Sequence, residues 1–390
     1  MSNPRFGGRG RLAPATAAAV ILAALLPLPG ANAGAAAAPF GWVSAVAVSP
    51  STGRVLLGIG DNPGRCLWWS DDHGAHWQVA KGLGKASHVS AIAFSPSHPN
   101  VVYAGVSWSP PEGYATAFLV STDAGESWAW ATWQQQVSIF GGKLPAKLPA
   151  AIYALVVDPK DSGTVYADTQ GVVRRTRDGG KTWSPARAGL PSAGKVGRPG
   201  NVGTSAHLEQ QIAADPAGTL YYASFHAVGT DQVYRSADGG SSWQRAGFGL
   251  PPDRRRGYVL ALASDPAGPP GSVYAAGSRG VWVTRDAGRR WTLALPSYST
   301  SIQVAHGTVF VAQYHTLWRR VGQGPWAPRS SAADDYAVDA TTPTRVYGWA
   351  WQQDDSKDRY CAQLWGSSDG GETWRSLVNG LPLARQNCGR

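Results

Sequence analysis

The chain of 390 residues is 43% hydrophobic and only 15% charged, and it carries a formal net charge of +10. The apolar share can supply a large core, and the excess of Lys and Arg mildly favours acidic partners or surfaces. The one dense basic run, Arg254-Arg255-Arg256, lies in a Pro-rich stretch typical of a loop, without a helix-turn-helix, zinc-knuckle or phosphate-loop motif. Nucleic-acid binding is therefore not expected.

The first 33 residues are typical of a secretory signal peptide. Three arginines precede an unbroken apolar run from Ala17 to Leu26, and Ala31-Asn32-Ala33 offers a small-x-small cleavage site. The run is well short of the roughly 20 residues that a spanning helix needs, so no membrane span is expected after cleavage. An uncleaved membrane anchor is the alternative. Residues 34–40 would form a short leader, and the mature chain, secreted or periplasmic, would carry +7 because three of the positive charges are removed.

An apolar segment that ends in Ser-Pro or Asp-Pro recurs along the rest of the chain. Val43–Pro50 is followed by four related segments, which end at Pro96, Pro159, Pro216 and Pro266. Most of them lack polar alternation, as expected of strands that are buried on both faces. A Gly/Pro/Asn/Asp turn then leads to a second strand, for example Val102-Tyr103-Ala104. The pattern predicts the first two strands of a repeated unit.

The second half of each unit holds the pattern Ser/Thr-x-Asp-x-Gly-x-x-Trp, which we call a clasp. The clasp aspartates are Asp72, Asp123, Asp178, Asp238, Asp286 and Asp369. The carboxylate can accept hydrogen bonds from the N–H groups of a tight turn, the Gly supplies positive φ, and the Trp buries a large apolar surface. A residue that is repeated in every unit serves the unit, so these aspartates are interpreted as structural.

The spacing of the clasps gives the number of units. The first five are about 50 residues apart, but the gap from Asp286 to Asp369 is nearly double. Within this gap, strand-like segments lead to Pro325-Trp326, which stands where a clasp should be but has lost its Asp. We therefore predict an all-β fold in which residues 41–390 form a single seven-bladed β-propeller. Each blade has four antiparallel strands, and the sixth has a degenerate clasp.

The clasp resembles the Asp-box (BNR) repeat of β-propellers, found in sialidases, sortilin-type receptors, xyloglucan-degrading enzymes and photosystem assembly factors. The resemblance implies the fold but not the function, since the family includes both enzymes and binding proteins. A typical sialidase would need an early Arg-Ile-Pro segment and a Tyr/Glu pair. No Arg-Ile-Pro occurs, and only Glu112 and Glu209 lie outside clasps. A xyloglucanase-like enzyme would use two aspartates between two propellers, whereas one propeller is predicted here.

Propellers usually bind ligands at the mouth of the central channel. The loops from second to third strand and from blade to blade lie on that face, opposite the clasps. Two blade-to-blade connections, 133–149 and 185–206, are long and rich in Gly, Pro and basic residues, which favours a functional rim. When the repeats are aligned, each column holds the equivalent residues of all blades. Glu209 and Gln211 stand in columns where other blades have apolar residues, and Asp168 occupies a column that holds Gly in two blades. A carboxylate in such a column is costly unless it is paired or hydrated, so these positions are either functional or solvated by the channel.

The candidate ligand-binding residues are the polar and aromatic side chains predicted at the mouth: Trp108, Tyr114, Asp168, His207, Glu209, Gln211, His226, Trp349 and Trp351. Packing of Trp349 between blades is an equally good interpretation. No ligand spacing supports a metal site, and no cofactor is expected. In an enzyme, the catalytic carboxylates would be drawn from Glu209, Asp168 and Asp61, with about 5 to 9.5 Å between the two that act.

Cys361 and Cys388 flank the last blade, and export makes oxidation possible, so we predict a disulfide between them. Cys66 would remain as the odd thiol, and a Cys66–Cys388 bridge is the alternative pairing. The expected function is that of a secreted monomeric module that binds an extracytoplasmic protein or glycan at the channel mouth. A carbohydrate-active enzyme, either a glycoside hydrolase or a lyase, is the alternative.

Overall fold

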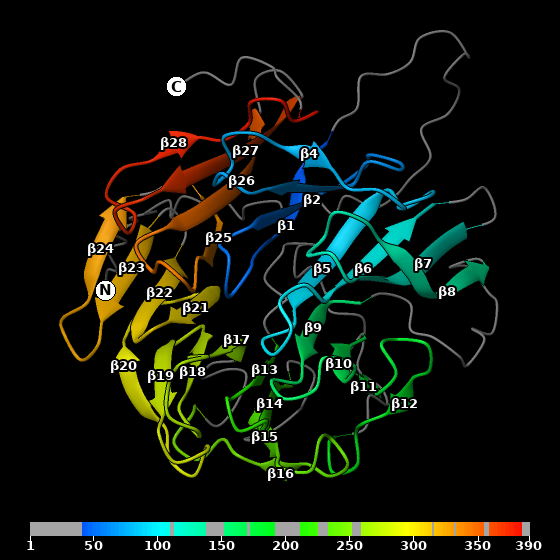
Figure 1. Ribbon diagram of the computed structural model, residues 1–390. Coiled ribbons are helices and arrows are strands. Elements are labelled where there is room, and N and C mark those ends of the chain that lie inside the picture. Colours follow the sequence, from blue (N-terminus) through cyan, green and yellow to red (C-terminus); the bar gives the residue numbers. More distant parts are fainter. Residues whose placement is uncertain are drawn as a thin grey trace, which may run out of the picture.

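The structure is a computed structural model that describes residues 41–109, 113–137, 152–169, 172–191, 211–224, 233–251, 259–313, 316–330, 333–354 and 359–383. These residues form seven four-stranded antiparallel sheets arranged around a common centre (Figure 1). The prediction of an all-β, seven-bladed propeller with four strands per blade is confirmed. Residues 1–40, which hold the predicted signal peptide and leader, lie outside the described residues.

The first four blades contain sixteen strands. They are β1 Val43–Val48, β2 Val55–Ile59, β3 Leu67–Ser70 and β4 Gln78–Val79 in blade 1; β5 His88–Phe94, β6 Val102–Trp108, β7 Gly113–Ser121 and β8 Ala129–Val137 in blade 2; β9 Ala154–Val157, β10 Val165–Asp168, β11 Val173–Thr176 and β12 Ser184–Pro185 in blade 3; and β13 Ile212–Ala214, β14 Leu220–Ala223, β15 Val233–Ser236 and β16 Gln244–Arg245 in blade 4.

The last three blades complete the ring. Their strands are β17 Val259–Ser264, β18 Val273–Gly277, β19 Gly280–Thr284 and β20 Thr292–Leu295 in blade 5; β21 Ser301–Ala305, β22 Thr308–Gln313, β23 Thr316–Val321 and β24 Ala327–Ser330 in blade 6; and β25 Asp335–Val338, β26 Val346–Asp354, β27 Arg359–Ser367 and β28 Arg375–Ser376 in blade 7.

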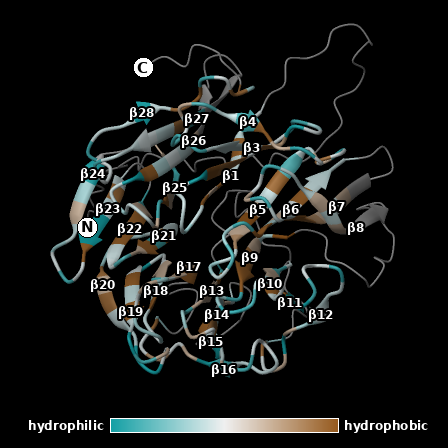
Figure 2. Cartoon of the chain, viewed as in Figure 1, coloured by the Kyte–Doolittle hydropathy of each residue, from teal (hydrophilic) through white to brown (hydrophobic). Residues whose placement is uncertain are grey.

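Each sheet follows chain order from the centre of the ring outwards. The first strands of neighbouring blades contact one another around the ring, from β1 with β5 to β21 with β25 and β25 with β1. The second strands β2, β10, β14 and β18 are buried along their whole length. Hydrophobic residues therefore concentrate on the strands, whereas the outer turns are largely hydrophilic (Figure 2). The first strands, which the sequence predicted to be buried on both faces, are only partly buried in β1 and β5. Burial on both faces is complete in the second strands instead.

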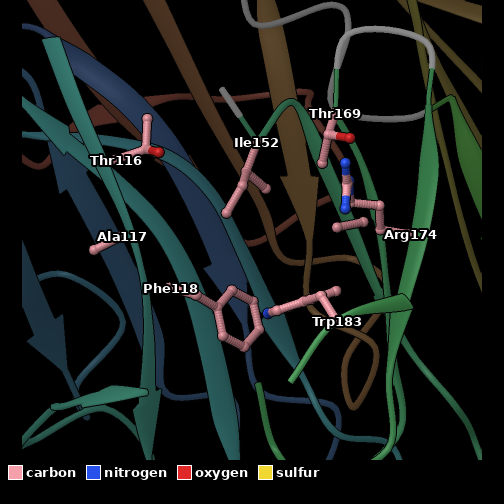
Figure 3. Close-up of a pocket in the computed structure, with 8 residues that line it drawn as sticks. Thr116, Ala117, Phe118, Ile152, Thr169, Arg174 and Trp183 are labelled. Atoms are coloured by element: carbon pink, nitrogen blue, oxygen red, sulfur yellow. The ribbon is translucent and has the colours of Figure 1, made fainter. Parts of the chain in front are cut away.

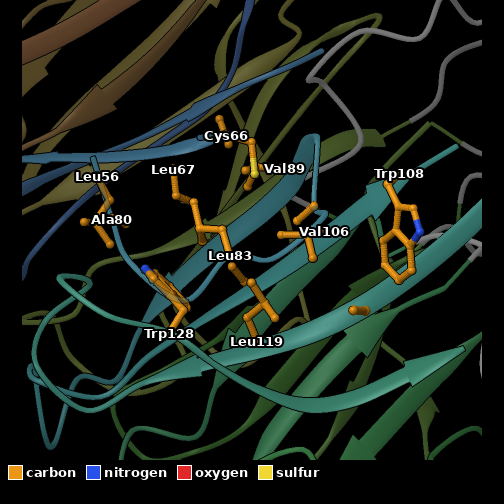
Figure 4. Packing of buried hydrophobic residues seen from close by; sticks show 14 of the residues in the cluster. Leu56, Cys66, Leu67, Ala80, Leu83, Val89, Val106, Trp108, Leu119 and Trp128 are labelled. Carbon is orange, nitrogen blue, oxygen red and sulfur yellow. The ribbon is translucent and has the colours of Figure 1, made fainter. Parts of the chain in front are cut away.

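The hydrophobic core lies between the blades. Between blades 1 and 2, Leu56 and Leu67 pack with Val89, Leu119 and Trp128, and the same cluster includes the free, buried thiol of Cys66 (Figure 4). Blade 7 closes on blade 1 through a cluster of the same kind. A parallel bridge from Gly41 to Leu383 and a hydrogen bond from Trp77 Nε1 to the carbonyl of Leu377, at 2.9 Å, join the two ends of the propeller.

All six clasps have the predicted Asp turn. In blade 4, Asp238 Oδ1 accepts hydrogen bonds from Ser236 Oγ at 2.7 Å and from the backbone N–H of Ser242 at 2.8 Å, while Ser236 Oγ accepts one from Gly240 N–H at 2.9 Å. The other five clasps repeat this network. Gly240 has a φ of 78°, which a residue with a Cβ rarely adopts.

Blade 6 keeps the clasp tryptophan although it lacks the Asp. Trp326 Nε1 donates to the carbonyl of Ala294 in blade 5 at 2.8 Å. Trp243 of blade 4 does the same to Ala186 in blade 3, also at 2.8 Å. In blades 1, 4, 5 and 6 the tryptophan thus ties a blade to the preceding one. In the other three blades it donates to the Gly carbonyl of its own clasp, as Trp128 does to Gly125.

Candidate functional site

Two neighbours of blade 1 carry hairpins that extend beyond the described strands of the other blades. The β6–β7 hairpin of blade 2 continues three residue pairs past Gly105, to Trp108 opposite Ala115, and the β26–β27 hairpin of blade 7 continues five pairs past Trp349. The β2–β3 pairing of blade 1 stops at Gly58. At about 3.3 Å per residue, the two hairpins rise about 10 and 16 Å above that level. They lie on either side of blade 1 (Figure 1). Each clasp follows the far end of the third strand, so the hairpin tips lie on the face opposite the clasps.

The loop of blade 1 between these hairpins carries Asp61. Its backbone is fixed to the connection from blade 1 to blade 2, because Asn62 N–H donates to the carbonyl of Ser87 at 3.0 Å and Gly64 N–H donates to that of Ala86 at 2.8 Å. Asp61 has a φ of 52°, in the left-handed region. Non-glycine residues in this conformation cluster at functional sites. The residue is exposed, yet partial burial of its carboxyl group raises the pKa of Asp61.

Trp42 and His88 lie beside this loop. The Trp42 ring covers Gly60 so closely that a Cβ at Gly60 would be 2.3 Å from it. The rings of Trp42 and His88 have their centroids 5.7 Å apart at an angle of 45°. Burial lowers the pKa of His88 to about 4, so its imidazole is neutral at physiological pH.

Three buried polar atoms in this region have no hydrogen-bond partner among the described residues. They are His88 Nδ1, Asn62 Nδ2 and Ser44 Oγ. Asn62 is only 6% exposed. Ser44 lies against Gly58, which itself packs on Val89, the residue after His88. Buried polar groups are nearly always hydrogen-bonded, so a polar group that entered this corner would satisfy them.

The predicted residues of blades 3 and 4 lie elsewhere on the mouth. Asp168 is 1% exposed, and the hydroxyl of Tyr222 donates to its Oδ2 at 3.4 Å. Burial and the neighbouring Asp168 raise the pKa of Tyr222 well above its usual range. Gln211 is buried, and its backbone carbonyl accepts a hydrogen bond from Ala223 N–H at 2.8 Å. His207, Glu209 and His226 lie outside the described residues.

The two predicted tryptophans that can be placed are buried. Trp108 is 5% exposed and packs edge-on against Trp130, with centroids 5.3 Å apart, while Lys85 Nζ lies 5.0 Å from its ring centroid. Trp349 is 6% exposed and packs in the core between blades 7 and 1. This is the packing interpretation of Trp349 that the sequence also allowed. Neither ring forms an open platform.

Tyr114 and Trp351 are placed by strand register alone, opposite Gln136 and Ala362. Cys388 lies outside the described residues, and nothing describes the side chain of Cys361. Their pairing stays a prediction. Among the described residues, no group of three His, Cys, Asp or Glu side chains could hold a metal ion. The same part of the chain contains no helix long and apolar enough to cross a membrane.

The sequence did not single out Trp42, Asn62, His88 or Asp335. Asp335 pairs with Trp349 and occupies the column of Ala45, where a buried carboxylate breaks the repeat as Gln211 does. Comparing the columns could have found it. Trp42, Asn62 and His88 gave no such signal, because their importance comes from contacts between a blade and the connection that follows it.

No family model matches the chain. A xyloglucanase from Paenibacillus sp. is 29% identical over 317 residues, covering 74% of this chain and 26% of that protein. The xyloglucanase Xgh74A of Acetivibrio thermocellus is 31% identical over 176 residues, covering 40% of this chain and 19% of that protein. The chain therefore spans about a quarter or less of the length of the curated relatives that it matches.

Two solved structures share the fold. A GH74 xyloglucanase from Xanthomonas campestris superposes with a TM-score of 0.54 at 14% identity, covering 87% of this chain and 68% of that one. YCF48 from Cyanidioschyzon merolae superposes with a TM-score of 0.52 at 13% identity, covering 83% and 94%. The chain is a seven-bladed propeller of the Asp-box type, distantly related to the GH74 xyloglucanases.

Proposed function

We propose that this protein is a glycan-binding propeller that acts outside the cytoplasm as a monomer. The ligand is a neutral polysaccharide of the β-glucan class, bound over blade 1 between the raised hairpins of blades 2 and 7. The observation that carries the proposal is the corner formed by Asp61, Asn62 and His88, where a partly buried carboxylate lies in the same loop as Asn62, and where Asn62 Nδ2 and His88 Nδ1 are buried without a partner among the described residues.

The chemistry of this corner suits sugar hydroxyl groups. Each hydroxyl both donates and accepts a hydrogen bond, the Asp61 carboxylate accepts, and the Asn62 amide nitrogen donates. His88 is neutral at physiological pH, so the two side chains that lie deepest carry no charge. The choice of a glucan over other neutral glycans is supported by the sequence similarity to xyloglucanases.

Titration calorimetry of the full chain with xyloglucan oligosaccharides, and with mannan oligosaccharides as comparison, tests this function. We expect Asn62→Ala to weaken glucan binding about tenfold through the loss of one hydrogen bond, and Asp61→Asn to weaken it at least as much. Asp71→Asn is the matched control, because Asp71 is an exposed carboxylate on the clasp face, bonded to Arg54 at 2.5 Å. Equal affinity of all three variants and the wild type would disprove the site.

Glycoside hydrolysis is the second candidate function. It is favoured by the partial burial of the Asp61 carboxyl, which raises the pKa of that group as a general acid requires. A second carboxylate would have to lie within about 5 to 9.5 Å. Asp168 is on blade 3 and buried against Tyr222. Release of reducing sugar from xyloglucan by the wild type, but not by Asp61→Asn, would establish hydrolysis. Binding without release would leave the binding function alone.

A further inference from the structure

One position in blade 3 breaks a column that is apolar or aromatic in every other blade. In each blade, one residue of the third strand pairs with the third residue of the second strand, as Trp68 pairs with Leu57. In blade 6 the partner is the fourth residue, Val311, because β22 begins one residue earlier than the other second strands. This residue packs towards the preceding blade, since Trp68 is in the cluster shared with blade 7. The column contains Trp68, Leu119, Tyr234, Trp282, Trp318 and Trp365. Blade 3 has Arg174, opposite Ala167.

The exchange leaves a small cavity between blades 2 and 3. Its volume is about 10 Å³, enough for roughly one water-sized group. Phe118 and Trp183 form its floor, edge to face with centroids 4.9 Å apart, and the Arg174 guanidinium points towards Thr169 at the other end (Figure 3). Ile152, Ala117, Ala167 and the hydroxyl-bearing Thr116 complete the lining. Apolar surface thus surrounds a cation at one end of the cavity.

Arg174 has no partner among the described residues. No hydrogen bond or ion pair joins its guanidinium to any of them, and its buried Nε is unsatisfied. Burial lowers the pKa of Arg174, and no neighbouring carboxylate offsets this. Other arginines are paired: Arg329 lies 2.6 Å from Glu372, and Arg345 lies 3.0 Å from Asp339. A partly buried cation that lacks a counter-charge among the described residues is costly, so a bound anion would stabilise it.

We propose that Arg174 binds the carboxylate group of a short monocarboxylic acid in this cavity between blades 2 and 3. The planar guanidinium forms two parallel hydrogen bonds with a carboxylate, which suits this group better than a tetrahedral dianion that needs several cations. The cavity holds only about one water-sized group, so the first carbon of the stem enters it and the carboxylate lies against the half-buried guanidinium at its end. The acid can be free or can be the end of a larger ligand such as a sugar acid. The site is separate from the glycan site proposed over blade 1.

Thermal melts of the full chain, followed by tryptophan fluorescence, test the proposal. Sodium acetate, sodium propionate and sodium glucuronate are each titrated against sodium chloride at constant ionic strength. We expect a saturable rise in Tm with acetate or propionate. In Arg174→Leu the half-saturating concentration should increase about tenfold or more, because the charge-assisted pair is lost. Without ligand, Arg174→Leu should melt at or above the wild type, because an aliphatic residue restores the column.

Two further variants make the result decisive. Arg177→Leu removes an exposed arginine of the same blade in its clasp, and it should respond to acetate like the wild type. Arg174→Gln keeps a polar side chain of similar length and replaces the Leu variant if that one fails to fold. A stronger response to glucuronate than to acetate would identify a sugar acid as the source of the carboxylate. If none of the three acids acts beyond chloride, or if Arg174→Leu and Arg174→Gln respond like the wild type, the proposal is wrong.

Discussion

At the scale of single residues, the clasp is a small hydrogen-bond network built around one carboxylate. The sequence pattern predicted that the Asp would accept backbone N–H groups, and all six clasps confirm it. It did not predict that the Ser or Thr at the start of the clasp both donates to the Asp and accepts from the Gly, as Ser236 does. A pattern records which residue types recur, but the direction of each hydrogen bond depends on the turn geometry.

This network leads to a prediction for Asp238→Ala. The change removes the acceptor of the Ser236 hydroxyl and of the Ser242 N–H, so the free energy of unfolding should fall by about 1 to 3 kcal/mol. Glycan binding should not change, since the clasp lies on the face away from the mouth. Urea unfolding and calorimetry on the same preparation measure both. Weakened binding with unchanged stability would contradict the structural role of the clasp.

The clasps also predict how stability depends on pH. Hydrogen bonds from the hydroxyl groups of Thr182 and Ser242 lower the pKa of Asp178 and Asp238 to about 2, whereas an unfolded Asp titrates near 3.9. The folded pKa is the lower one, so the stabilisation is fully present above about pH 5 and is lost as the pH falls towards 2. Unfolding by urea between pH 6 and pH 2.5 should show this decline. In Asp238→Ala the decline should be shallower, because one of the titrating groups is missing.

At the scale of the blade, the order of four strands was predictable because each strand repeats its apolar pattern. The lengths of the strands in each blade were not predictable. Blades 2 and 7 have second strands that extend past their neighbours, and the Trp-containing stretch from Val346 to Asp354 reads as one strand only once its partner from Arg359 to Ser367 is known. Pairing with the neighbouring strand decides where such a strand ends, and the sequence of one strand does not identify its partner.

The degenerate blade gives a prediction at this scale. Trp326→Phe keeps an aromatic ring but removes the hydrogen bond to Ala294, so it should cost about 1 kcal/mol of stability. Trp69→Phe is the matched control, because Trp69 contacts Arg54 through its ring face, 4.5 Å from the centroid, and that contact survives the change. Urea unfolding compares the two variants. Equal stability losses in both would mean that the link from blade 6 to blade 5 depends on ring packing alone.

At the scale of the whole molecule, the number of blades followed from the clasp spacing and the one long gap. The candidate site did not follow in the same way. Asp61 was named as a carboxylate, but its neighbours Trp42 and His88 come from the starts of two different blades, and only the packing of blade 2 against blade 1 brings them together. Asp168 was correctly noted as breaking its column, and the structure pairs it with Tyr222 of the next blade.

Closure of the ring is where the predicted disulfide would act. The described contacts between the ends are a bridge from Gly41 to Leu383, the hydrogen bond from Trp77 to Leu377, and packing between blades 7 and 1. A Cys361–Cys388 bond would hold the chain just after Leu383 against the last blade. A loop of this length contributes about 3.5 kcal/mol in the chain-entropy model, so reduction should lower Tm by several degrees. Peptide mapping without reductant should recover the linked pair, with Cys66 as a free, buried thiol whose pKa is raised to about 12. A Cys66–Cys388 peptide, or three free thiols, would show instead that blade 7 is closed without this bond.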